Sequence, residues 1–124
     1  MNILKLENTG IDDMQIDLKP LSKVLGLHAF IRGESWDYER ITYDYKIGSN
    51  EKNISYYIRI QAYAIEGDID RADAVVKIMP PLLGKHYYPH GIEYGEDAEF
   101  SKNLIERATG LVKNAAKDLQ KYAK

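Results

Sequence analysis

Residues 33–67 read GESWDYERITYDYKIGSNEKNISYYIRIQAYAIEG, and this stretch decides the fold. Apolar and polar residues alternate along two segments of it. Such alternation is typical of half-buried β-strands, because successive side chains face opposite sides. The turn-forming residues 48–53 separate the two segments. We therefore expect a long antiparallel hairpin.

The second strand of this hairpin has an unusually low charge. One of its faces carries Ile54, Tyr56, Ile58, Ile60, Ala62 and Ala64, and the other carries Tyr57, Arg59, Gln61 and Tyr63. Arg59 is the only full charge between Ile54 and Ile65. This pattern predicts a strand at the centre of its sheet, with its second face at least partly covered.

The first strand places Ile41, Tyr43, Tyr45 and Ile47 on one face. Trp36 and Tyr38 extend the strand upstream, but on the opposite phase. A bulge of one residue near Glu39 and Arg40 would absorb this shift.

Shorter elements flank the hairpin. We expect strands at residues 3–6, 14–18, 28–32 and 74–79, and a strand or extended segment at 82–88. A short helix is predicted to begin near Pro20 and to end at Gly26 in a left-handed conformation.

A long amphipathic helix is predicted for residues 98–123, with Asp97 as its N-cap. Its apolar face includes Phe100, Leu104, Leu111 and Leu119, which we expect to be buried against the hairpin. About 26 helical residues span about 39 Å, which is close to the length of the strands.

The fold class that follows is α+β in a single domain, residues 1–124. We expect a curved antiparallel sheet of five or six strands, a long C-terminal helix packed on one face, and a short N-terminal helix. The chain has 124 residues, enough for one hydrophobic core.

Composition excludes several classes of protein. The chain contains no cysteine, so it has neither disulfides nor thiolate chemistry, which fits a reducing cytoplasm. A net charge of −2 argues against nucleic-acid binding driven by bulk electrostatics. No apolar run approaches the roughly 20 residues of a membrane span, and residues 1–5 do not resemble a signal peptide.

The segments GESWDYERITYDYK (33–46) and GKHYYPHGIEY (84–94) resemble the YugN-like family of small proteins from Bacillus and its relatives. The resemblance extends over most of the chain, including AIEG (64–67), DAVVKIM (73–79) and the final helix. It implies a cytoplasmic bacterial protein. It transfers no catalytic residue, since the family has no established biochemical role.

Two groups of residues are candidates for metal binding, and both fit poorly. His86 and His90 are four residues apart, but Pro89 and Gly91 argue against the helix that would bring them together. Glu93, Asp97 and His28 could complete a site in three dimensions, although the set has no cysteine and no recognised ligand spacing. The loop with Asp68, Asp70 and Asp73 departs from the calcium-loop motif. Aspartates that cap backbone N–H groups explain this loop better. We therefore expect no metal, no cofactor and no catalytic motif.

Tyrosine is the unusual residue, with ten copies against two of phenylalanine. Most of these rings are expected to fill the sheet faces. A sharper hypothesis is that Tyr43, Tyr45, Tyr57 and Tyr63, with Arg59, line either a cavity or a subunit interface. A sheet face bearing Tyr57, Tyr63 and Ile65 would be costly to leave in water, which favours a homodimer through a tyrosine-bearing sheet face or an edge strand.

Two functions therefore stay open. The sequence favours a non-catalytic, homodimeric binding or interaction protein, with a small-molecule ligand as a further candidate partner. The alternative is a small enzyme acting on an anionic metabolite, in which Arg59 holds the anion and His86 or His90 moves a proton. The candidate ligand-binding residues are Arg59, His86, Tyr87, Tyr88 and His90. Pairing of Arg59 with Asp44 or Glu66 would favour the first function, and a buried Arg59 facing an unfilled pocket would favour the second.

Overall fold

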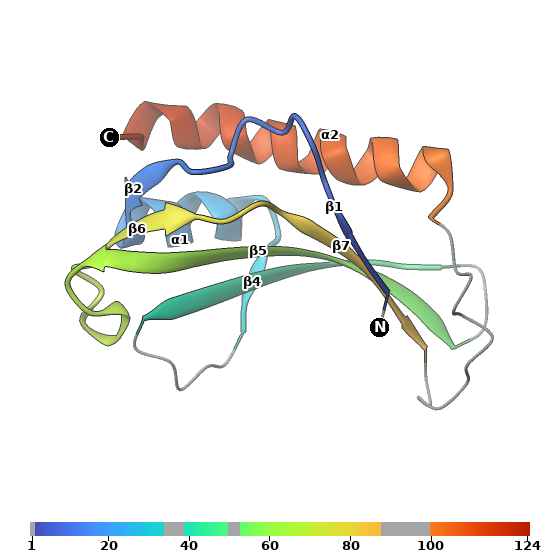
Figure 1. Ribbon diagram of the computed structural model, residues 1–124, viewed down its shortest axis with the longest axis horizontal. Helices are drawn as coiled ribbons and strands as arrows, with labels where there is room; N and C mark the ends of the chain where they lie inside the picture. The colour runs from blue at the N-terminus through green and yellow to red at the C-terminus, as the bar shows by residue number, and fades with distance from the viewer. Residues whose placement is uncertain (1, 34–38, 50–52, 88–99) are drawn as a thin grey trace.

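A computed structural model describes residues 2–33, 39–49, 53–87 and 100–124. It contains a seven-stranded antiparallel sheet, with helices α1 and α2 on one side of it (Figure 1). The elements are β1 (Asn2–Lys5), β2 (Gln15–Asp17), α1 (Leu18–Leu27), β3 (Ile31–Arg32), β4 (Arg40–Ile47), β5 (Ile54–Glu66), the 3₁₀ turn Ile69–Arg71, β6 (Val75–Ile78), β7 (Leu82–Tyr87), α2 (Lys102–Leu119) and the 3₁₀ turn Gln120–Tyr122. The predicted α+β class is confirmed.

The central hairpin is formed by β4 and β5. The two strands pair without interruption from Arg40 opposite Tyr63 to Ile47 opposite Tyr56. On its other edge β5 pairs with β6 near one end and with β7 near the other. The prediction of a central strand is therefore confirmed, and β5 positions every other strand except the edge strands β1, β2 and β3.

The two faces of the sheet differ in what lies on them. Residues that pair directly across an antiparallel ladder point to the same side, so the register assigns each side chain to a face. We call the face beneath α1 and α2 the covered face. We call the opposite one, on which neither helix lies, the open face (Figure 1).

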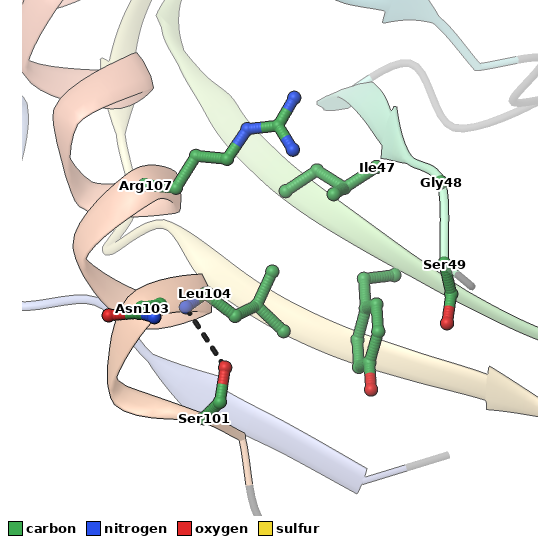
Figure 2. Close-up of a pocket in the computed structure, with 8 residues that line it drawn as sticks. Ile47, Gly48, Ser49, Ser101, Asn103, Leu104 and Arg107 are labelled. Atoms are coloured by element: carbon green, nitrogen blue, oxygen red, sulfur yellow. Dashed lines mark hydrogen bonds between the residues drawn. The ribbon is translucent and has the colours of Figure 1, made fainter. Parts of the chain in front are cut away.

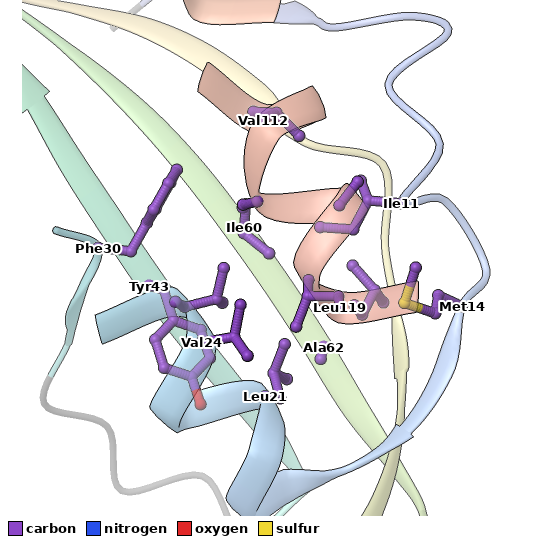
Figure 3. Packing of buried hydrophobic residues seen from close by; sticks show 14 of the residues in the cluster. Ile11, Met14, Leu21, Val24, Phe30, Tyr43, Ile60, Ala62, Val112 and Leu119 are labelled. Carbon is purple, nitrogen blue, oxygen red and sulfur yellow. The ribbon is translucent and has the colours of Figure 1, made fainter. Parts of the chain in front are cut away.

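The hydrophobic core fills the space between the covered face and the two helices (Figure 3). Ile58, Ile60 and Ala62 of β5 are fully buried there. Tyr43 of β4 is buried as well, and its hydroxyl forms a hydrogen bond with Ser22 of α1. The alternation in β4 and β5 thus supplies most of one wall of the core.

Helix α2 begins later than the sequence suggested. Its N-cap is Ser101, whose side-chain oxygen accepts a hydrogen bond from the backbone N–H of Leu104 at 3.1 Å. The predicted N-cap, Asp97, lies outside the described residues. Since a serine in extended conformation satisfies a free N–H of the first turn, the helix starts at Lys102 and not near residue 98.

The buried stripe of α2 consists mainly of small side chains. Its fully or nearly fully buried residues are Ala108, Val112, Ala115, Ala116 and Leu119. Of the four large residues predicted to be buried, only Leu119 is; Phe100, Leu104 and Leu111 are half-buried at the edge of the core. The stripe is rotated toward the alanines, because small side chains allow closer packing of the helix on the sheet.

Helix α1 includes Gly26 and continues to Leu27, so Gly26 is not its stop. The left-handed residue is Ala29, with φ of +66°. The N–H of Ala29 donates to the carbonyl of Gly26, and the N–H of Phe30 donates to that of Leu25. These are the two bonds of a Schellman motif, formed here without glycine at the left-handed position. The strand that follows is shorter than predicted, because this cap occupies residues 28–30.

The bulge predicted near Glu39 and Arg40 depends on Trp36 and Tyr38, which lie outside the described part of the chain. The described ladders show an irregularity elsewhere, where β5 shifts register against β6 between Ala64 and Glu66.

Candidate functional site

Arg59 and Asp44 form an ion pair at the centre of the open face. They lie opposite each other on β5 and β4. Arg59 Nε donates to Asp44 Oδ1 at 2.9 Å, and Nη2 donates to Oδ2 at 3.0 Å. The hydrogen bond with Asp44 raises the pKa of Arg59 above its ordinary value, although partial burial opposes this effect. Asp44 occupies the Nε–Nη2 side of the guanidinium, so that side is not available for a bidentate contact with a substrate anion.

His86 lies on the same face but away from Arg59. It pairs with Ser55 on β5, whereas Arg59 pairs with Leu82, four residues earlier on β7. At about 3.4 Å per strand residue this separates the two by roughly 14 Å. Tyr57 stands between these two ladder positions, and its ring meets the imidazole edge-on at 6.4 Å between centroids. Arg59 and His86 therefore share a face but not a pocket.

The remaining candidate residues are at the end of β7 or follow it in sequence. Tyr87 pairs with Ile54 at the end of β7. Tyr88 and His90 lie outside the described residues. The third histidine, His28, is engaged elsewhere, since its Nε2 lies 2.7 Å from Asp118 Oδ2.

The tyrosines are divided between the two faces. Tyr43 and Tyr45 belong to the covered face, where burial raises the pKa of Tyr43 above its ordinary value. Tyr57 and Tyr63 lie on the open face, opposite Lys46 and Arg40. These four rings cannot line one cavity or one interface, and only Tyr57 and Tyr63 remain candidates for a contact surface.

The open face also carries apolar and cationic side chains at its margins. Ile3 and Ile31, on the edge strands β1 and β3, are exposed by 57% and 74%. Register places Lys5, Arg40 and Lys46 on the same face. The face thus has a centre of Tyr57 and the neutralised Arg59–Asp44 pair, with exposed isoleucines and cations around it.

The acidic loop does not use its first aspartate as predicted. Asp68 precedes the 3₁₀ turn without a side-chain capping bond, and its carboxylate lies 3.9 Å from Arg71. The backbone makes the turn through Gly67 and Ala72, both at positive φ. A Cβ at Gly67 would approach Ala74 Cα to 3.2 Å, so a glycine is required there.

Within ranges 2–33, 39–49, 53–87 and 100–124, no three or more His, Asp or Glu side chains are grouped so as to hold a metal ion. Over the same ranges, no helix has both the length and the apolar character needed to cross a membrane.

A cavity lies on the covered side of the sheet, between the β4 end of the hairpin turn and the start of α2 (Figure 2). It measures about 340 Å³ and is lined by Ile47, Gly48, Ser49, Tyr56, Ser101, Asn103, Leu104 and Arg107. Sequence reasoning missed it, because its residues come from three segments and share no motif. The only sequence clue was an arginine one turn inside the helix.

Comparison with known proteins identifies the relatives of this chain. The model of the YugN-like family matches residues 6–124. The uncharacterized protein YlbA of Bacillus subtilis is 41% identical over 118 residues, covering 95% of this chain and 97% of YlbA. The uncharacterized protein YugN of the same organism is 24% identical over 85 residues, covering 68% of this chain and 62% of YugN.

A solved structure shares the fold. The crystal structure of the uncharacterized conserved protein YugN from Geobacillus kaustophilus HTA426 is 40% identical in sequence. The two superpose with a TM-score of 0.83, over 95% of this chain and 96% of the other.

Proposed function

The chain belongs to the YugN-like family, and we propose that it is a non-catalytic binding or interaction protein that acts as a homodimer through the open face of its sheet. The observation that carries the proposal is the Arg59–Asp44 pair at the centre of that face. A paired arginine supports a contact surface, whereas the enzyme alternative requires Arg59 to be free for a substrate anion. His86, roughly 14 Å away along the ladder, does not join it in a common site.

The layout of the open face resembles that of a protein interface. Interfaces have a centre depleted in unpaired charge and enriched in tyrosine and arginine, surrounded by a polar rim. Here Tyr57 and the Arg59–Asp44 pair occupy the centre, Lys5 and Arg40 lie at strand ends, and Lys46 lies opposite Tyr57, one residue before the end of β4. The exposed Ile3 and Ile31 add apolar area that a second copy would cover.

Substitutions at two positions of similar exposure test the proposal. Ile31 on the open face is 74% exposed, and Leu27 at the end of α1 is 78% exposed. We expect wild type to scatter light as a particle of about twice the 14.2 kDa chain mass. Ile31→Glu should shift it to the monomer mass, while Leu27→Glu should leave the dimer intact. A wild-type monomer at high concentration, or equal effects of the two substitutions, would contradict the proposal.

Salt dependence separates a second copy from an anionic partner. A symmetric dimer brings the rim cations of two copies near each other, so screening should strengthen it as ionic strength rises. Binding of this basic rim to an anionic partner would weaken under the same change. A dimer that dissociates with added salt would argue against the open face as its interface.

We also propose a cytoplasmic location, which the absence of cysteine supports. Fractionation of cells that express the protein from its own promoter would check this, with recovery outside the cytoplasm as the contrary result.

A further inference from the structure

The cavity between the hairpin end and α2 lies on the covered side of the sheet, apart from the proposed dimer face (Figure 2). We propose that it binds a small monocarboxylic acid with an apolar body, the carboxylate against Arg107 and the body against Ile47 and Leu104. This goes beyond the proposed dimer, because neither the cavity nor Arg107 belongs to the open face.

The size of the cavity limits the ligand. Its volume of about 340 Å³ is in the lower range of small-molecule sites. At about 30 Å³ for each water-sized group, it holds about ten non-hydrogen atoms. A six- to eight-carbon acid, with about eight to ten non-hydrogen atoms, matches this space.

The floor of the cavity is apolar. Ile47, the last residue of β4, is buried, and Leu104 of α2 packs half-buried against the core. Tyr56 also lines the space, and its ring is tilted against that of Phe100, with 6.1 Å between the ring centroids. Ile47 is already almost fully buried, so an apolar body placed here would remove from water the exposed hydrocarbon surface of Leu104 and Tyr56, which a small hydrated anion would not do.

Arg107 provides the charge. It extends from α2 over the cavity toward Ile47 (Figure 2). In the described part of the chain Arg107 has no ion-pair partner, in contrast to Arg59, which forms an ion pair with Asp44. None of the described lining residues is a carboxylate, and the two observations together favour a ligand carboxylate that the Arg107 guanidinium can hold with two parallel bonds.

The polar lining residues on and before α2 differ in orientation. Asn103 carries an amide, and it lies on the same helix one turn before Arg107. Ser101 already accepts the N–H of Leu104, so that the exposed start of the helix is capped internally. Recognition of the anion is assigned to the side chain of Arg107, which extends toward the cavity, whereas the Asn103 amide lies on the other side of the helix (Figure 2).

Three probes test the site in the wild-type protein. Hexanoate supplies both carboxylate and apolar body, hexan-1-ol supplies the body, and inorganic phosphate supplies charge alone. We expect hexanoate to produce saturable shifts in the methyl resonances of Ile47 and Leu104. The alcohol and phosphate should bind at least about tenfold more weakly, since each lacks one half of the recognition. Equal binding by either would overturn the proposal, as would the absence of saturable shifts with hexanoate.

Two variants test whether Arg107 is the cation that binds the carboxylate. Arg107→Gln should weaken hexanoate binding about tenfold or more, while Lys113→Gln, an exposed cation two turns further along α2, should not. Arg107 is exposed, so the variant is expected to fold; an unchanged melting temperature checks this. Unchanged binding by Arg107→Gln would refute the assignment. The light-scattering mass of this variant should match wild type, so that failure here is distinguishable from failure of the dimer.

Discussion

The two faces of β5 are built from alternate residues of one strand, yet they have different physical roles. On the covered face, Ile58, Ile60 and Ala62 are removed from water by α1 and α2. On the open face, Tyr57, Arg59 and Tyr63 alternate in phase with these residues and remain partly exposed. A strand of period two thus separates a folding surface from a surface available for contact.

The two faces also differ in the polar groups that they contain and in the partners of those groups. The covered face contains a buried hydroxyl, Tyr43, and gives it a hydrogen-bond partner in Ser22. The open face contains a charged arginine and pairs it with Asp44. Stability should therefore depend on the volume of the buried side chains on the covered face, and on interactions with other molecules on the open face.

The largest effect should come from removing volume on the covered side. Leu119→Ala is expected to lower the free energy of unfolding by about 2–5 kcal/mol, because Leu119 is fully buried between α2 and the sheet. Ile31→Ala on the open face should change it by less than about 0.5 kcal/mol. Urea denaturation at a concentration where the chain is monomeric measures both. Similar losses for the two would break the distinction between the faces.

A smaller effect is expected at the buried phenol. Tyr43→Phe should cost about 0.5–1.5 kcal/mol near neutral pH, because it leaves Ser22 without its partner.

The same substitution has a pH signature. Burial raises the pKa of Tyr43 above its ordinary value of 10.0, so the unfolded chain loses this proton at lower pH than the folded chain does. The stability of wild type should thus fall relative to Tyr43→Phe as pH rises above about 10. A difference between the two that stays constant from pH 8 to pH 11 would argue against a buried phenol.

The open-face ion pair should contribute less. Arg59 and Asp44 remain 43% and 27% exposed, so solvent screens their attraction. A double-mutant cycle with Arg59→Gln and Asp44→Asn is expected to give a coupling of about 0.2–1 kcal/mol in the monomer. A coupling above about 3 kcal/mol would mean that the pair stabilises the fold in the manner of the covered face.

The smallest effect should come from the surface contact between α1 and α2. The hydrogen bond from His28 lowers the pKa of Asp118, aided by the charges of His28, Lys121 and Lys117 and opposed by slight desolvation. A carboxyl group whose pKa is lowered in the folded state stabilises the fold at pH values above its ordinary pKa. This stabilisation is lost as the pH falls through the pKa of the folded state. The melting temperature of wild type should be higher than that of Asp118→Asn at about pH 5, and the two should be equal at about pH 2. A gap that widens toward acid would contradict the contact.

Much of the fold follows from periodicity alone. The alternation along residues 41–47 and 54–64 is long enough to assign both strands and both faces, and the lack of charge places β5 at the centre. Helix ends were less predictable. Ser101 and Ala29 form caps through local hydrogen bonds, for which Asp97 and Gly26 were equally suitable by residue type. The rotation of α2 toward its alanines depends on packing distance, which is a tertiary property.

The candidate site was only partly predictable. Arg59 stood out as a lone charge, but its partner Asp44 depends on the hairpin register. Histidine spacing suggested His86 and His90 as a pair, although spacing along a chain does not give direction in space. The cavity beside Arg107 combines residues about 50 positions apart, so no local pattern could indicate it.

The most direct test of the contact role of the open face compares two tyrosines of similar exposure. Tyr63 on the open face is 37% exposed, and Tyr122 beyond α2 is 44% exposed. Hydroxyl-radical labelling across a dilution series should modify both equally in dilute samples. In concentrated samples Tyr63 should become protected while Tyr122 stays reactive. Constant labelling of Tyr63 at all concentrations, or selective protection of Tyr122, would contradict a homodimer formed through the open face.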